Sequence, residues 1–171
     1  EDYAIKLATD LIDNFQNIYE DKWLNMMRNK LGLFGEEKKD KKLINDLLEW
    51  MKKNKADYTN TFCHLMDVKS NDEIYKKTDF LTWIDKWKLR SQLNNSSKEK
   101  QIKLMRKNNP IIIPRNHKVE EALKEANNGN LNKINRLLNI LDKPYDDQDI
   151  ANEYRLPAPE SKKKYQTFCG T

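Results

Sequence analysis

Glycine and proline are scarce in this sequence, with four glycines and five prolines among 171 residues. Because β-hairpin turns depend largely on these two residues, little material is left for a sheet built of hairpins. No apolar run is longer than three residues, which excludes a membrane-spanning helix and the apolar core of a secretory signal. We therefore expect a soluble protein with no membrane partner.

Cysteine is equally scarce, since Cys63 and Cys169 are the only two and lie far apart. Two distant cysteines do not make a disulfide scaffold, which fits a reducing cytoplasm better than secretion. The sequence also lacks the G-x-G-x-x-G and G-x-x-x-x-G-K-[ST] motifs that cradle phosphate groups. We predict a cytoplasmic chain that binds no cofactor, nucleotide or metal by itself.

Charged residues are abundant, at 35% of the sequence, and both signs occur at close spacing. Such mixing is typical of exposed helix faces. Apolar residues recur every three or four positions, which is the spacing of a buried helix face. The predicted helices run from Ile5 to near Gly32, from Asp40 through Met51, from Asp57 or Thr59 through Met66, from 70–72 through Trp87 either unbroken or with a restart at Thr78 or Asp79, from 96–97 to before Pro110, over 116–127 and over 130–141.

This pattern predicts an all-α fold, an irregular or orthogonal multi-helix bundle over residues 1–155. Residues 156–171 lack apolar periodicity and contain Pro157 and Pro159, so we predict an extended tail. The helical pattern is already running by Ala4, and the first residue is Glu1. We therefore expect the chain to be a fragment of a longer protein.

The tail carries Cys169 within seven residues of three lysines, 162–164. Nearby positive charge favours the thiolate, and exposure would make that thiolate available for exchange. A frayed terminus with an inert thiol is the alternative.

Catalysis needs groups that converge, and the sequence offers few candidates: Cys63, His64, His117 and Cys169. Adjacent residues such as Cys63 and His64 point to different sides of a helix, so they make a poor pair of zinc ligands. A packed cysteine and a surface histidine explain them better than a metal site or a Cys-His nucleophile. Core packing likewise explains Trp83 and Trp87, one helical turn apart, better than a ligand cage does.

Nucleic-acid binding is the main alternative function. Positive charge gathers between Lys98 and Arg115, and the helices over 116–127 and 130–141 could mimic a helix-turn-helix. No aromatic residues interleave the basic stretch to stack on bases, so nucleic acid is the less favoured partner. A helical protein-interaction module without an enzymatic parent belongs to the same alternative.

Several motifs occur together in a recognisable order. The sequence contains W-x-x-x-M-x-x-K-L-G-L from Trp23, then D-Y-T from Asp57 and Tyr58, and N-P-x-x-x-P-R-N-H from Asn109. Further matching residues are Phe62, Trp83, Trp87, Leu137, Leu138, Pro144, Tyr145 and Cys169. Together they resemble the C-terminal portion of the selenoprotein O family, the SelO or YdiU proteins, over nearly the whole chain.

The resemblance implies a kinase-like parent protein that transfers AMP from ATP, with Mg²⁺ or Mn²⁺, to Ser, Thr or Tyr of protein substrates. The family's nucleotide-binding and catalytic residues belong to an N-terminal kinase-like domain that this sequence lacks. The chain would then be a non-catalytic helical part that packs on that domain. We accordingly expect it to leave an apolar face exposed when it is alone.

The resemblance assigns one regulatory residue. Cys169 matches the position near the C-terminus where animal members have selenocysteine, which implies redox control through a bridge to the kinase-like domain. The other motif residues are interpreted as structural, with Asn116 as a helix N-cap and Arg115 in a charge pair. These structural residues are Trp23, Asp57, Tyr58, Asn109, Pro110, Arg115 and Asn116.

Overall fold

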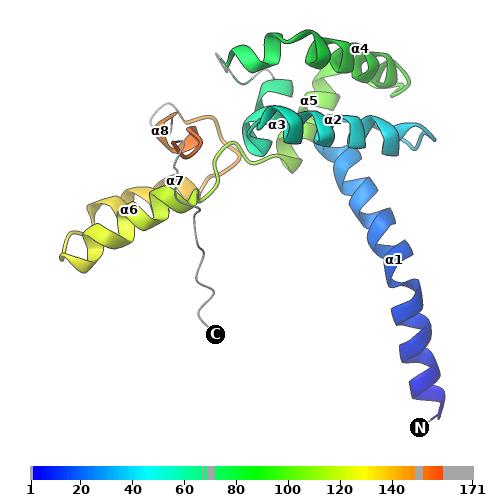
Figure 1. The fold of residues 1–171 in the computed structure, drawn as a ribbon, viewed down its shortest axis with the longest axis horizontal. Helices are drawn as coiled ribbons and strands as arrows, with labels where there is room; N and C mark the ends of the chain where they lie inside the picture. Colours follow the sequence, from blue (N-terminus) through cyan, green and yellow to red (C-terminus); the bar gives the residue numbers. More distant parts are fainter. Residues whose placement is uncertain (1, 67, 69–71, 149–151, 160–171) are drawn as a thin grey trace. The chain divides into compact units, whose positions relative to one another are not determined.

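The computed structural model describes residues 2–66, 68, 72–148 and 152–159, and within them it contains eight α-helices, one 3-10 helix and no strand (Figure 1). The predicted all-α fold is confirmed. The chain divides into two compact units, Glu1–Ile111 and Ile112–Thr171. The predicted boundary between a helical domain over 1–155 and a tail over 156–171 stays a prediction.

Unit 1 contains six helical elements, and side-chain caps fix where three of them begin. The carboxylates of Asp57 and Asp72 and the hydroxyl of Ser97 each accept a backbone N–H from the first turn that follows. All three caps lie where the sequence predicts a helix start. The elements are α1 (Asp2–Lys30), α2 (Asp40–Asn54), α3 (Tyr58–Leu65), η1 (Glu73–Lys76), α4 (Thr78–Gln92) and α5 (Lys98–Asn108).

Tryptophans from α4 form part of the core of unit 1. The rings of Trp83 and Trp87 stack with centroids 6.2 Å apart and are almost fully buried. Each indole N–H donates to a carbonyl oxygen, Trp83 to Leu43 at 2.9 Å and Trp87 to Leu31 at 2.9 Å. The predicted core packing is confirmed, and the indole bonds tie α4 to α2 and to the end of α1.

Gly32 ends α1 with a left-handed residue, φ +66°. The N–H of Leu33 donates to the carbonyl of Arg28, and the N–H of Gly32 donates to that of Asn29, which is the Schellman pattern. A Cβ atom at Gly32 would lie 2.6 Å from Cγ of Gln101 on α5. Glycine therefore serves both the backbone turn and the close packing of α5.

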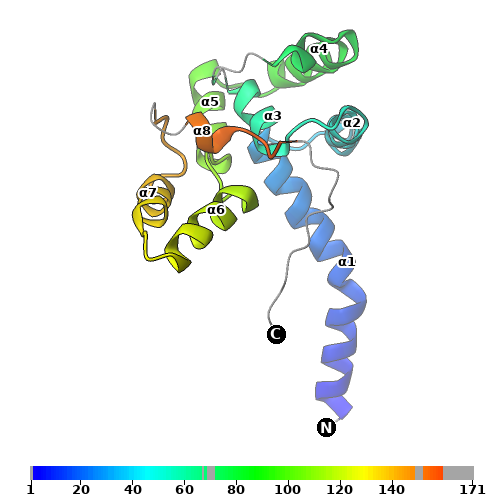
Figure 2. The same ribbon diagram turned by 60° about the vertical axis from the view of Figure 1, so that its left-hand side comes forward.

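The first two-thirds of α1 extends away from the rest of unit 1, as both ribbon views show (Figures 1 and 2). Residues 3–22 are all exposed, and burial begins only with the half-buried Trp23. Large apolar side chains are among them, including Ile12 at 74% exposure and Phe15 at 64%. The expected exposed apolar face is confirmed.

Unit 2 contains a helical hairpin of α6 (Asn116–Asn127) and α7 (Asn132–Leu141), followed by the short α8 (Asn152–Arg155). Gly129, at φ +84°, makes the turn in the hairpin. The buried side chains of the three helices are Ala122, Leu137, Ile140 and Tyr154. No helix in the described part of either unit is long and apolar enough to cross a membrane.

One predicted cap in unit 2 is wrong. The N-cap position of α6 is Arg115, whose backbone is extended, and Asn116 is the first helical residue. No side-chain hydrogen bond caps this helix. The sequence suggested Asn116 because asparagine favours caps, but the extended segment after Pro114 ends at Arg115, so the helix begins one residue earlier than predicted.

Candidate functional site

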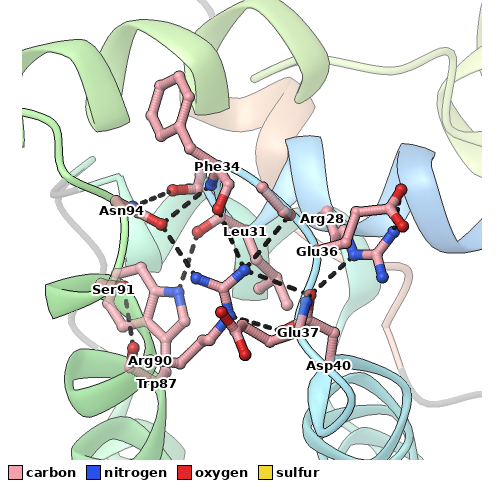
Figure 3. A network of polar contacts seen from close by, with 12 residues as sticks. Arg28, Leu31, Phe34, Glu36, Glu37, Asp40, Trp87, Arg90, Ser91 and Asn94 are labelled. Carbon is pink, nitrogen blue, oxygen red and sulfur yellow. Dashed lines mark hydrogen bonds and ion pairs between the residues drawn. The ribbon is translucent and has the colours of Figure 1, made fainter.

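The most concentrated polar cluster in the described residues is a buried ion network centred on Asp40, the first residue of α2 (Figure 3). Its carboxylate is 0% exposed and lies between two buried guanidinium groups. Arg28 of α1 donates from Nε to Oδ2 at 2.7 Å, and Arg90 of α4 donates from Nε to Oδ1 at 2.6 Å. Three helices therefore meet at one carboxylate.

Arg90 extends the network into the loop between α1 and α2. Its Nη2 donates to the carbonyl oxygens of Phe34 at 3.1 Å and Gly35 at 3.4 Å, and its Nη1 donates to Oδ1 of Asn94 at 3.2 Å. Asn94 in turn accepts the N–H of Phe34 and donates to the carbonyl of Gly32, each at 2.9 Å. The side chains of Arg90 and Asn94 thus hold the loop through its backbone N–H and carbonyl groups.

The surroundings of Asp40 keep its carboxylate charged. Burial alone would raise its pKa, but hydrogen bonds from Arg90, from the backbone N–H of Glu37 and from Arg28 outweigh it and hold the pKa below its usual value. Glu36 also pairs with Arg28, since its Oε1 lies 3.0 Å from Nη1 of that arginine. The charged groups satisfy one another, so the network acts as a structural lock rather than as a reactive centre.

A second set of contacts gathers two motif residues, Asn109 and Tyr58, around Lys30 at the end of α1. The buried Asn109 donates from Nδ2 to the carbonyls of Lys30 and Met105, each at 2.8 Å. The ammonium of Lys30 donates to the carbonyl of Asn108 at 3.2 Å and lies 5.4 Å from the ring centroid of Tyr58. Burial lowers the pKa of Lys30.

Other motif residues lie in unit 1 as well. The carboxylate of Asp57 caps α3 by accepting the N–H of Asn60 at 2.8 Å. The carbonyl oxygen of Pro110 lies 3.9 Å from the sulfur of the buried Cys63. Trp23 is half-buried on α1. The interpretation of Asp57, Tyr58, Asn109 and Pro110 as structural residues stays a prediction.

The motif residues Arg115 and Asn116 belong to unit 2, at the start of α6. The charge pair expected of Arg115 stays a prediction. Cys169, the predicted redox residue, lies outside the described residues.

Unit 2 has its own polar hollow, of about 340 Å³. One of its lysines pairs with acids across the helical hairpin: Lys133 of α7 bonds both Glu121 and Glu125 of α6. The hydrogen bond from Lys133 lowers the pKa of Glu121. Arg136 of α7 lies 3.0 Å from Glu153 of α8. Ion pairs therefore join the helices around the hollow, and carboxylates neutralise its positive charge.

The candidate residues His64 and His117 belong to different units. The ring of His64 stacks on that of Tyr75 with centroids 4.2 Å apart, while His117 lies in unit 2. Within the described part of the chain, no group of three or more His, Cys, Asp and Glu side chains could hold a metal ion. The predicted packed cysteine is confirmed for Cys63, which is 0% exposed.

The Asp40 network was not predicted from the sequence. Arg28, Asp40, Arg90 and Asn94 resemble ordinary surface residues in the sequence, since residues of these types are mostly exposed in proteins. One signal was available: Arg90 follows Phe80, Trp83 and Trp87 at helical spacing and therefore lies on the buried face of α4.

Comparison with known proteins provides independent information. The model of one protein family, described as "Protein adenylyltransferase SelO", matches residues 4–142. Similar curated proteins include a "Protein nucleotidyltransferase YdiU" from Pelagibacter ubique, 54% identical over 100% of this chain, and others from Nitrosococcus oceani, at 42% over 98%, and Alkaliphilus metalliredigens, at 43% over 100%. The chain spans only 36%, 34% and 35% of these relatives' own lengths.

Proposed function

The chain belongs to the SelO family of protein adenylyltransferases, and from that premise we propose that it is the non-catalytic helical part of an enzyme that transfers AMP from ATP to Ser, Thr or Tyr side chains of proteins. In that reaction a substrate hydroxyl attacks the α-phosphorus in line. A new oxygen–phosphorus bond forms as the α–β phosphoanhydride bond breaks and pyrophosphate leaves.

The observation that carries this proposal is the family match, which covers residues 4–142 of 171. The relatives are named as nucleotidyltransferases, and this chain spans about a third of their length. ATP and its Mg²⁺ or Mn²⁺ are accordingly assigned to the remainder of the longer protein, the kinase-like domain. Protein substrates are assigned to the longer protein as well.

The two polar clusters support a structural role for this chain. In each of them the acids are bonded to neighbouring cations, so neither offers a ready site for a triphosphate and its metal. We assign no step of the reaction to a residue of this chain. Its role in the proposal is to support the nucleotide-binding part.

The test is intact-mass analysis of the full-length protein and a protein substrate after incubation with ATP and Mg²⁺. We expect a mass increase of one AMP moiety. An ATP analogue with a methylene group between the α- and β-phosphates should abolish the increase, because that bond must break. An analogue with the methylene between the β- and γ-phosphates should still allow it.

A mass increase of one phosphate would contradict the proposal, and so would the absence of any change with ATP. The 171-residue chain alone is the matched control, for which we expect no transfer. Transfer by this chain alone would place the chemistry in residues to which the proposal gives none.

We further propose that Cys169 provides redox control in the longer protein. The neighbouring lysines, 162–164, favour its thiolate, which is the form that exchanges with disulfides. In the full-length enzyme, Cys169→Ser should make AMP transfer insensitive to added reductant. The buried Cys63 offers the matched control, and Cys63→Ala should leave the sensitivity intact. Reductant sensitivity that persists in Cys169→Ser would remove this role.

A further inference from the structure

The front part of α1, residues 3–22, is exposed and carries several large apolar side chains. Its large apolar side chains are between 41% and 80% exposed. Ile5, Leu7, Leu11, Ile12, Phe15, Ile18 and Tyr19 face one side of the helix together with Ala4 and Ala8. We call this side the α1 face.

Such a helix needs a partner in order to persist. A stretch of about 20 residues is only marginally helical in water by itself, and most helical stability comes from packing an apolar face. The first contact with α2 is the exposed ion pair between Glu20 and Lys41, at 2.8 Å. Before Glu20, the described residues of unit 1 leave the α1 face exposed.

The width of the α1 face indicates what kind of surface covers it. At 100° per residue, its nine members span about 160° of the helix circumference. The seam of a two-helix coiled coil is narrower, because it needs only two positions in seven. A face this wide fits a groove formed by several elements of a folded domain, rather than the single α1 helix of a second copy.

The acids of this part of α1 lie on the side opposite the face. Asp10, Asp13, Glu20 and Asp21 all lie there, so the charged side remains free to meet water while the apolar side is buried. The relatives, which are about three times as long as this chain, contain the additional sequence that could build such a groove.

From these observations we propose that the α1 face docks into an apolar groove of the kinase-like domain, formed by the part of the same polypeptide that precedes Glu1 in the longer protein. The inference rests on the proposed function for the existence of that domain. Beyond the proposed function, it identifies which helix docks and which part of the protein receives it. Because the two parts are covalently joined, docking is intramolecular and needs no high affinity.

The test is hydrogen–deuterium exchange of residues 3–22 in the full-length protein and in the 171-residue chain. Amides in a packed helix are protected, whereas those in an unsupported helix exchange readily. We expect the amides of 3–22 to exchange at least about a hundredfold more slowly in the full-length protein. Equal exchange in the two proteins would overturn the proposal.

Paired substitutions show whether the α1 face is responsible for the protection of these amides. Phe15→Asp, at the centre of the α1 face, should remove most of the protection of residues 3–22 in the full-length protein. Asn17→Asp, on the opposite side, should leave that protection unchanged. If Phe15→Asp prevents folding, the comparison of the two wild-type proteins still decides the question.

A second copy as occupant would give a different result. The 171-residue chain would then be dimeric by light scattering, and its residues 3–22 would be protected without the rest of the polypeptide, which would overturn the proposal. The exchange measurement does not depend on AMP transfer. Protection with no transfer would refute the proposed chemistry alone, and transfer with no protection would refute the docking alone.

Discussion

Asp40→Asn is expected to lower the free energy of unfolding by about 3–5 kcal/mol, because it removes the buried counter-charge that two buried arginines share. The substitution keeps the size of the side chain and removes its charge. Arg28 and Arg90 are 8% and 7% exposed, so water cannot replace the lost carboxylate. Chemical denaturation of the 171-residue chain at neutral pH would measure the change.

Asp46→Asn is the matched control on the same helix. Asp46 pairs with Lys42 at 2.9 Å on the surface, where an i,i+4 ion pair contributes only about 0.3–0.5 kcal/mol. A loss of similar size in the two variants would show that burial of the Asp40 network has no energetic weight.

The pH dependence provides an independent check on Asp40. Because its pKa is lower in the folded than in the unfolded chain, its contribution is complete above the unfolded value of about 3.9. The contribution is lost as the pH falls through the lower folded value. The stabilities of the wild-type chain and Asp40→Asn should therefore converge in acid, and a constant difference would contradict the assignment.

Gly32→Ala is expected to destabilise the chain by about 2–5 kcal/mol. A non-glycine residue in the left-handed region costs roughly 1–2 kcal/mol. The new Cβ would also lie 2.6 Å from Cγ of Gln101 and 2.8 Å from Cγ of Met105, and overpacking of this kind costs roughly 1–3 kcal/mol more. Thermal or chemical unfolding of the variant would measure the sum.

Gly35→Ala separates the two contributions. Gly35 has nearly the same backbone angle, φ +69°, but a Cβ atom there meets nothing within 4 Å. This variant should show only the backbone cost, roughly 1–2 kcal/mol. If the two alanine variants were equally stable, the close approach of α5 to Gly32 would have no energetic consequence.

The features that could be predicted from the sequence are those that depend on near neighbours in the chain. Asp57, Asp72 and Ser97 cap helices by bonding an N–H two or three residues ahead, so their roles can be recognised locally. Trp83 and Trp87 are buried because they share the apolar side of one helix. The end of α1 near Gly32 was predicted because glycine commonly follows the last turn of a helix.

The Asp40 network depends instead on distant partners. Asp40 and Arg28 are 12 residues apart, and Asp40 and Arg90 are 50 apart. Charged residues make up 35% of this sequence, so nothing local distinguishes these three from solvated ones. The position of Arg90 on the same side of α4 as Trp83 and Trp87 was the one signal of its burial. Using that signal requires knowing which side of α4 is buried.

The main chain of the loop after α1 has one more consequence. The carbonyl oxygens of Lys30, Leu31, Gly32, Phe34 and Gly35 each accept a hydrogen bond from the side chain of Asn109, Trp87, Asn94 or Arg90. Peptide groups are the same whatever side chain they carry. An exposed side chain in this loop, such as that of Glu36, can therefore be replaced without loss of these hydrogen bonds, whereas inserting or deleting one residue between Lys30 and Gly35 would shift the acceptors that follow it away from their donors.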